Sequence, residues 1–212
     1  MILPSLYAVV DAEVCARSGA APVQVAESFL QAGVRLIQLR AKGVTAGELF
    51  DLTSAVLALA SGSATVIVND RADVARLAGA AGVHVGQTDL PVADVRRLLG
   101  PEAVVGLSTH SVEQARAALA LHVSYIAVGP VFGTATKDTG VAPVGLDLVA
   151  RVARLASERA VPVVAIGGIT LDRAPDVLAA GASSVCVISD LLRGDPGARV
   201  RAYLTALGPG IA

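Results

Sequence analysis

The sequence contains little cysteine and few aromatic residues. Its two cysteines among 212 residues, Cys15 and Cys186, lie far apart and form no CxxC motif. We therefore expect neither a disulfide framework nor a zinc site, and we expect Cys186, inside an apolar run, to be a small buried side chain. Tryptophan is absent and aromatic residues make up 3%. The core must therefore be built from alanine, valine, leucine and isoleucine.

The sequence also lacks an excess of positive charge and a long apolar run. Its formal net charge is −1 without a run of like charges, which argues against a binder of nucleic acid or of a membrane surface. No apolar run reaches the roughly 18 residues of a membrane-spanning helix, and the start MILPSLYAVVD lacks the basic region of a signal peptide. We expect a cytoplasmic protein that binds small molecules; the pattern leaves open whether it forms a homo-oligomer.

Short runs rich in valine and isoleucine alternate with longer segments of helical spacing along the whole chain, without a linker. The expected strands are residues 5–10, 36–39, 65–68, 82–85, 104–107, 125–129, 163–167 and 184–189. The expected helices are residues 22–32, 45–60, 70–78, 91–98, 111–120, 145–159, 171–180 and 197–207. Thr45 and Glu48 form a capping-box pattern at the start of one of these helices.

This alternation predicts an α/β fold, a single-domain (β/α)8 TIM barrel over residues 1–212. The expected strands are apolar at nearly every position, which fits a parallel sheet covered on both faces. An open doubly wound sheet is the alternative. We favour the barrel because eight units can close without leaving an edge strand, and because 212 residues are long enough for it.

Lysine is scarce in this chain, and its two occurrences stand in unusual places. Against 15 arginines there are only Lys42, in IQLRAK, and Lys137, in GPVFGTATKDTG, and each stretch follows or includes the end of an apolar run. Polar residues follow the other expected strands as well. They are Gln38, Arg40, Asn69, Asp70, Asp89, Ser108, Thr134, Thr136 and Ser189.

In a parallel barrel these positions meet at one rim, where barrel enzymes carry their chemistry. Helix capping is the plainer explanation for the Asn, Asp, Ser and Thr residues, which are preferred caps. Capping does not account for Gln38, Arg40 and Lys42, which alternate along the chain and so would point to one side of an extended segment.

The charges in these loops predict a site for a polyphosphate. The carboxylates Asp70 and Asp89 would face the cations Arg40, Lys42 and Lys137. Mg²⁺ takes one or two protein carboxylates and fills its remaining positions with phosphate oxygens and water. The cations would neutralise the remaining phosphate charge. The alternative is a network of salt bridges without a ligand.

A second anion site is indicated after the last two expected strands, by AIGGIT at residues 165–170 and ISD at residues 188–190. Loops at these positions of a barrel commonly bind phosphate through backbone N–H groups, and paired glycines let the backbone approach closely. Two phosphorylated ligands at one rim point to an enzyme that joins two substrates.

The motifs resemble those of the thiamine phosphate synthase family, also called thiamine phosphate pyrophosphorylase. The resemblance covers nearly the whole chain in order, and QLRxK combined with NDR, GQxD and TxTK is highly specific. The matching segments are LYAVVD (6–11), IQLRAK (37–42), VNDRADVA (68–75), GVHVGQTDL (82–90), GLSTHS (106–111), YIAVGPVFGTATK (125–137), AIGGIT (165–170) and VIS (187–189).

The resemblance implies a role for each matching residue. Hydroxymethylpyrimidine diphosphate would contact Gln38, Leu39, Arg40, Ala41, Lys42, Asn69, Ser108 and Lys137. Thiazole phosphate would contact Thr134, Ala135, Thr136, Gly168, Ile188 and Ser189. Asp70 and Asp89 look like Mg²⁺ ligands, and Lys137, Arg40 and Ser108 are the candidate catalytic residues.

The implied reaction is an alkyl transfer, in which the thiazole nitrogen displaces pyrophosphate through a largely dissociated pyrimidine cation. Lys137 would then stabilise the departing pyrophosphate, a contribution on the order of 3 kcal/mol to the barrier. Gly133 stands where the family often has proline, and Arg173 where many members carry asparagine.

Two rival functions remain at this point. The related thiazole tautomerase has a catalytic histidine where this chain has Pro130, and it lacks counterparts of Asp70, Asp89 and Thr136. A sensor that binds thiamine precursors without turnover would carry at least one broken element in the diphosphate site, and none is evident. His84, His110 and His122 share no metal-ligand spacing, so we expect them to be structural or solvated. We expect Tyr7 and Tyr125 to be packing residues.

Overall fold

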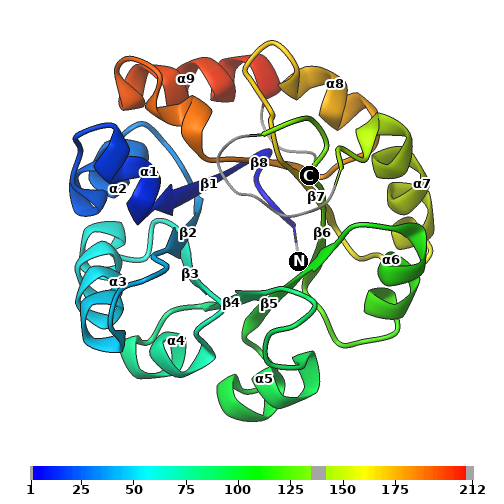
Figure 1. Ribbon diagram of the computed structural model, residues 1–212, viewed down its shortest axis with the longest axis horizontal. Coiled ribbons are helices and arrows are strands. Elements are labelled where there is room, and N and C mark those ends of the chain that lie inside the picture. The colour runs from blue at the N-terminus through cyan, green and yellow to red at the C-terminus, as the bar shows by residue number, and fades with distance from the viewer. Residues whose placement is uncertain (1, 135–141, 209–212) are drawn as a thin grey trace.

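The fold is a closed barrel of eight parallel strands with helices on its outside (Figure 1). The computed structural model describes residues 2–134 and 142–208. Each strand pairs with the next along the chain, and β8 returns to pair with β1, so no strand is left at an edge. The predicted (β/α)8 barrel is therefore confirmed, and the open doubly wound sheet is excluded.

The strands lie within a residue or two of their expected places. They are β1 Leu6–Asp11, β2 Leu36–Arg40, β3 Thr65–Asn69, β4 Gly82–Val85, β5 Val104–Thr109, β6 Tyr125–Val128, β7 Val163–Ile166 and β8 Ser184–Val187. The eighth expected strand, residues 184–189, was too long. Ile188 leaves the extended region with φ −118° and ψ −91°, and a 3-10 turn, η1 Ser189–Leu192, follows.

The helices between the strands cover the barrel. They are α1 Ala12–Arg17, α2 Pro22–Gln31, α3 Ala46–Ala60, α4 Ala72–Ala78, α5 Val92–Leu99, α6 Val112–Leu119, α7 Gly145–Ser157, α8 Ala174–Ala179 and α9 Pro196–Leu207. The capping box of Thr45 and Glu48 at the start of α3 is confirmed. Helix α1 was not expected, because six residues are too few to show helical periodicity. Within the described ranges no helix has the length and apolar character needed to cross a bilayer.

Apolar side chains form two layers, one on each side of the sheet. The larger layer fills the space between the strands and the helices, around residues such as Ile37, Val105 and Val149. The smaller one fills the inside of the barrel, around residues such as Leu36 and Val164. Cys186 belongs to the inner layer, and burial raises the pKa of its thiol, so it is an inert core residue as expected.

Gly82 provides a test of how tightly the strands approach one another. A Cβ atom at Gly82 would lie 1.8 Å from the carbonyl oxygen of Val104, its partner in β5. We expect Gly82→Ala to lower the free energy of unfolding by about 3 kcal/mol or more, because the added atom must push two paired strands apart. Urea unfolding measures this.

Gly47 in α3 supplies the matched control. A Cβ there would meet only the Thr45 hydroxyl oxygen, at 4.0 Å, so Gly47→Ala should raise the free energy of unfolding by about 0.5 kcal/mol through helix propensity. Equal stabilities for the two alanine variants would contradict the packing described for β4 and β5.

Candidate active site

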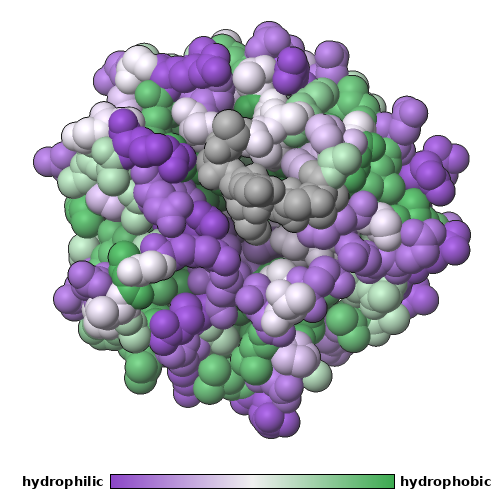
Figure 2. All heavy atoms as spheres, viewed as in Figure 1, coloured by the Kyte–Doolittle hydropathy of each residue, from purple (hydrophilic) through white to green (hydrophobic). Residues whose placement is uncertain are grey.

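The polar residues singled out in the sequence lie around one end of the barrel. Arg40 and Asn69 end β2 and β3, and Ser108 is the second-last residue of β5. Asp70, Asp89, Thr134, Gly168 and Ser189 lie in the segments that follow β3, β4, β6, β7 and β8. Figure 2 views this face and shows hydrophilic residues gathered across its centre. Ala135, Thr136 and Lys137 lie outside the described residues.

Arg40 is held inside the rim by an acid that the sequence reading had not singled out. Its guanidinium forms a short ion pair with Asp11, the residue beside it in the register of β1 and β2. Both side chains are buried, and the second Asp11 oxygen accepts a hydrogen bond from Val14 N at 3.0 Å, which caps α1. The Arg40 side chain is therefore fixed before any ligand arrives. The position of Asp11, at the end of the LYAVVD segment, was the signal in the sequence that could have indicated this role.

Lys42, Asp70 and Asp89 form a second charged group. Lys42 Nζ lies 3.3 Å from Asp70 Oδ2, and Asp89 Oδ2 accepts a hydrogen bond from Gly86 N at 2.7 Å. Asp70 has a left-handed backbone with φ 62°, and its N–H donates to the carbonyl of His84 at 2.8 Å. Such a conformation is rare for a residue other than glycine and is typical of functional sites.

The Asp89 carboxyl disfavours the charged form of Asp70. Burial raises the pKa of Asp70, the adjacent Asp89 carboxyl raises it further, and Lys42 opposes the change only in part. A bound cation would relieve this repulsion, and two carboxylates are a set that Mg²⁺ accepts when phosphate and water complete its shell. Among the described residues no three His, Cys, Asp or Glu side chains are grouped as metal ligands. The carboxylate oxygens of Asp70 and Asp89 are of the kind that fit a hard cation.

A cavity opens at the rim between β5 and β8. It brings together five residues that the sequence had assigned to substrates, and Pro130 and His110 also line it. The five are Ser108, Thr134, Gly168, Ile188 and Ser189. Gln38, Arg40, Lys42, Asn69, Asp70 and Asp89 do not line this cavity. The rim thus carries two regions, a charged one over β2 to β4 and a cavity over β5 to β8.

The paired glycines after β7 serve packing as well as approach to a ligand. Gly167 and Gly168 have φ values of 103° and 63°. A Cβ on Gly168 would lie 2.4 Å from the carbonyl oxygen of Gly133, and one on Gly167 would lie 2.5 Å from Pro130 Cα. Only glycine lets the segment after β6 lie directly against the loop after β7.

Asp190 fixes the turn that contains Ser189. This buried carboxylate accepts hydrogen bonds at 2.6 Å from both the Arg199 guanidinium and the Tyr203 hydroxyl of α9, and Arg193 Nε lies 3.3 Å away. The ISD motif was expected to form part of an anion site. Its aspartate lines the cavity, but it is also hydrogen-bonded to α9, which the sequence did not predict.

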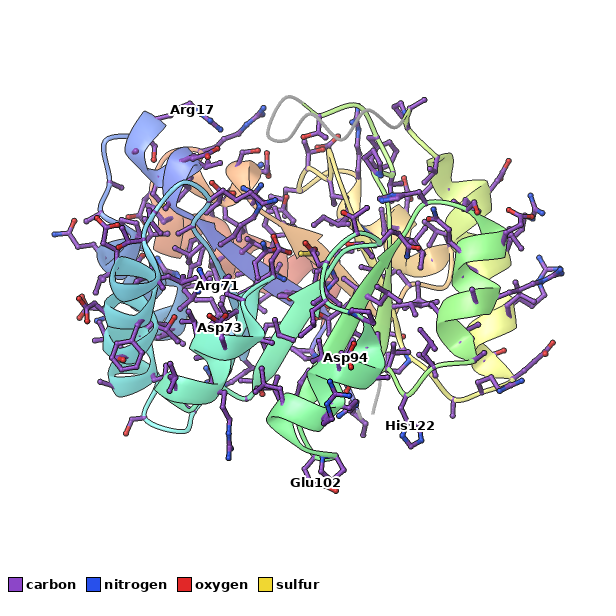
Figure 3. The ribbon with its side chains drawn as sticks, turned by 60° about the horizontal axis from the view of Figure 1, so that its bottom comes forward. Arg17, Arg71, Asp73, Asp94, Glu102 and His122 are labelled. Atoms are coloured by element: carbon purple, nitrogen blue, oxygen red, sulfur yellow. The ribbon has the colours of Figure 1, made fainter. Side chains whose placement is uncertain are left out.

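Arg173, which departs from the family pattern, lies at the edge of the cavity. Its guanidinium carbon is 4.7 Å from the centre of the Phe132 ring, and its Nη1 donates to the Gly168 carbonyl at 3.4 Å. Arg173 lines an outer groove beside the cavity, together with Arg17 and Arg193. Figure 3 shows Arg17 at this end of the barrel, and His122 and Glu102 at the opposite end.

A buried chain of polar side chains crosses the inside of the barrel below the rim. Gln38 Nε2 donates to the Tyr7 hydroxyl, which lies 3.0 Å from the Tyr125 hydroxyl. His84 Nδ1 lies 2.9 Å from the Tyr125 hydroxyl, and its Nε2 lies 2.8 Å from Ser108 Oγ. Both tyrosines are buried as expected, but their hydroxyls and His84 are linked to two candidate site residues. Sequence reading missed this link because the three residues lie on three different strands.

Helix capping and a salt-bridge network without a ligand were the two alternatives to a binding site, and neither explains all of the rim residues. None of Asn69, Asp70, Asp89, Ser108, Thr134 or Ser189 is the N-cap of a described helix; Arg71, Pro91 and Ser111 hold those positions for α4, α5 and α6. A network of salt bridges would pair Asp89 with a cation, but no described Lys or Arg lies within 4.0 Å of it. Among the described residues, capping therefore does not account for these six side chains, and ion pairing accounts for Arg40 and Lys42 but not for Asp89.

The fold and rim define the class first: a (β/α)8 barrel with converging charged and glycine-rich loops at its carboxyl end, the form of barrel enzymes that act on small molecules. A family model described as thiamine monophosphate synthase matches residues 6–191. The chain belongs to this family, which is a family of transferases.

Individual relatives agree with this assignment. The chain is 49% identical over 174 residues to a thiamine-phosphate synthase of Anaeromyxobacter dehalogenans, an alignment that covers 82% of this chain and 77% of the relative. It is 42% identical to a thiamine-phosphate synthase of Koribacter versatilis, with 97% and 96% covered. The solved structure of a thiamine phosphate pyrophosphorylase from Pyrococcus furiosus superposes with a TM-score of 0.83 at 26% identity, with 96% and 95% covered.

The Asp70 carboxylate should lower the stability of the metal-free protein. Because its pKa is raised on folding, the charged form is less favourable folded than unfolded; this cost is present above the folded pKa and vanishes below the unfolded value of about 3.9. At pH 7 in the presence of a chelator, we expect Asp70→Asn to have a higher free energy of unfolding than the parent. At about pH 3 the variant and the parent should have equal free energies of unfolding. Asparagine also tolerates the left-handed backbone.

Asp73→Asn is the matched control for this test. Hydrogen bonds from Arg71 lower the pKa of Asp73, so its amide variant should be slightly less stable than the parent at pH 7. Urea titrations across pH measure both variants. An Asp70→Asn protein less stable than the parent at pH 7 would show that the carboxylate pair carries no repulsion.

Asp11 should be important for stability because Arg40 is buried beside it. We expect Asp11→Ala to lower the free energy of unfolding by about 3–5 kcal/mol, since it leaves a buried guanidinium without its counter-ion. Asp195→Ala controls for the lost helix cap: Asp195 Oδ1 accepts from Ala198 N at 2.6 Å at the exposed start of α9, and its loss should cost about 1 kcal/mol. Equal losses in chemical denaturation would refute the special role of the buried pair.

Proposed function

We propose that this protein is a thiamine-phosphate synthase, which joins hydroxymethylpyrimidine diphosphate to thiazole phosphate and releases pyrophosphate. One observation carries the proposal. The charged group of Asp70, Asp89 and Lys42 lies on the same rim as the cavity that contains Gly168 and Ser189. Two anionic substrates can therefore meet over one opening, as a condensation requires.

The charged region over β2 to β4 is proposed to bind the pyrimidine diphosphate. Arg40, held by Asp11, and Lys42 would bind its phosphate oxygens, and Lys137 would join them from the loop after β6. Gln38, Leu39, Ala41 and Asn69 would complete this site. Ser108, which lines the neighbouring cavity, would contact the diphosphate from β5. Asp70 and Asp89 would hold Mg²⁺, which neutralises charge on the diphosphate when it is bound.

The cavity over β5 to β8 is proposed to bind the thiazole phosphate. The phosphate would lie against the backbone N–H groups at Gly168, Ile188 and Ser189. The thiazole ring would lie against Thr134, Ala135 and Thr136. Arg173, at the mouth of this cavity, adds a positive charge near the proposed phosphate position.

The chemistry asks the protein to position two molecules and to stabilise a leaving group. The lone pair of the thiazole nitrogen forms a bond to the pyrimidine methylene carbon, and the C–O bond electrons leave with pyrophosphate. Arg40, Lys42, Lys137 and the Ser108 hydroxyl would stabilise the negative charge that develops there. No side chain needs to form a covalent bond to the substrate.

The two rivals are less well supported. The tautomerase needs a histidine at the place of Pro130, and Pro130 itself lines the cavity. His110 also lines the cavity, but its Nδ1 is hydrogen-bonded to the carbonyl of Gly129. A sensor without turnover would not need the left-handed Asp70 beside a second carboxylate. We expect this arrangement to lower the stability of the metal-free protein.

The test is to incubate the purified protein with both substrates and Mg²⁺, and to follow pyrophosphate and thiamine phosphate. We expect both products in equal amounts, and none when Mg²⁺ is removed by a chelator. Binding of both substrates without either product would favour the sensor, and isomerisation of thiazole phosphate alone would favour the tautomerase.

Site variants sharpen this test. Lys137→Ala should lower kcat by about 10²-fold or more with little change in the affinity for thiazole phosphate. Asp70→Ala combined with Asp89→Ala should abolish turnover and its Mg²⁺ dependence, whereas Asp73→Ala on the outside of α4 should leave both unchanged. A double variant that keeps the parental rate would remove the metal assignment, and equal small effects of Lys137→Ala on kcat and on binding would remove the role of the lysine.

A further inference from the structure

The polar chain inside the barrel stands out because its surroundings are apolar. Tyr7 and Tyr125 are 1% and 0% exposed and pack against residues such as Val9 and Cys186 of the inner layer. Their hydroxyls nevertheless meet, and the chain runs without a break from Gln38 on β2 to Ser108 on β5. Buried polar groups are costly unless they are paired, so a complete chain of this length needs a reason.

The donors and acceptors along the chain give it a direction. Gln38 Nε2 can only donate, so the Tyr7 oxygen accepts and its own hydrogen points to Tyr125. Burial raises the pKa of both tyrosines well above the ordinary value, so both keep their hydrogens. Tyr125 then donates to His84 Nδ1, which leaves the His84 proton on Nε2, facing Ser108 Oγ.

We propose that Tyr7, Tyr125 and His84 are positioning residues that make the Ser108 hydroxyl a hydrogen-bond donor to the bound diphosphate substrate. Ser108 Oγ accepts a hydrogen bond from the Nε2–H group of His84, so the hydroxyl hydrogen of Ser108 is directed away from the barrel interior. A donor at that place suits a phosphate oxygen and, above all, one that gains charge as the C–O bond breaks. This role rests on the proposed function; the direction of the chain does not.

Gly106 supports the inference independently, because it makes room for the chain. It pairs with His84 on one side and with Tyr125 on the other, and it shares the inner face of β5 with Ser108. A Cβ at Gly106 would lie 2.1 Å from Tyr125 Cζ and 2.5 Å from His84 Nδ1. The two rings stack with centroids 5.6 Å apart and an angle of 18°. The absent side chain is what allows histidine and tyrosine to meet.

The direction of the chain can be measured without any substrate. The protein has three histidines, so ¹⁵N NMR of histidine-labelled protein, with His84→Gln to assign the signal, reports which His84 nitrogen carries the proton. We expect the proton on Nε2 in the parent and a mixture of tautomers in Tyr125→Phe, which removes the donor to Nδ1. A proton on Nδ1 in the parent would reverse the chain and overturn the proposal.

The effect on catalysis is tested by a double-mutant cycle. We expect Tyr125→Phe to lower kcat about tenfold with an unchanged KM for thiazole phosphate, and to have no further effect once Ser108→Ala is present, because both act through one hydroxyl. Equal losses in the two backgrounds would mean that Tyr125 is only structural.

Thr109→Val is the control for the loss of a buried hydroxyl. Thr109 is the next residue of β5, and its Oγ1 donates to the Ala127 carbonyl at 2.9 Å, on the other face of the strand from Ser108. This variant should lose stability to a similar degree as Tyr125→Phe and keep the parental kcat. A matching fall of kcat in Thr109→Val would assign the effect to stability and overturn the positioning role. If the protein does not turn over the two substrates at all, the proposed function fails and the tautomer measurement alone decides the inference.

Discussion

Closure of the parallel sheet is the constraint on which the other features depend. Because every strand runs in the same direction and β8 pairs with β1, all eight carboxyl ends reach one rim. Residues as distant in the sequence as Asp11 and Ser189 therefore lie at the same end of the barrel. The helices cover the outside and leave the rim as the place where charge can remain exposed to a ligand.

The rim is built to hold charge that is only partly balanced. Arg40 is neutralised by a buried acid, whereas Asp70 and Asp89 repel each other and Lys42 offsets this in part. Such an arrangement favours a bound cation, because a cation would relieve the repulsion between the two carboxylates. The left-handed backbone at Asp70 adds strain at the same place. Stability is thus lower at the rim than the apolar layers alone would allow, a common feature of functional sites.

The inside of the barrel contains a hydrogen-bond chain as well as packed apolar side chains. Its lower part is apolar, but Tyr7, Tyr125 and His84 carry a hydrogen-bond chain upward to Gln38 and Ser108 at the edge of the rim. The two regions of the rim, over β2 to β4 and over β5 to β8, are thereby joined through the core. Gly106 leaves the space in which the Tyr125 and His84 side chains meet, so the packing inside the barrel and this hydrogen-bond chain depend on the same residue.

The amino-acid sequence by itself determined the barrel and the identity of most rim residues, because periodicity, strand length and helix caps are local and the motifs stand at strand ends. It placed Gln38, Arg40 and Lys42 on one side and predicted the acids Asp70 and Asp89. Only the tertiary structure decided that Asp11 neutralises Arg40, that Asp190 is held by Arg199 and Tyr203 of α9, and that His84 links Tyr125 to Ser108. These contacts join residues on different strands or elements, and their distances depend on barrel closure and register, which no local pattern of residues encodes.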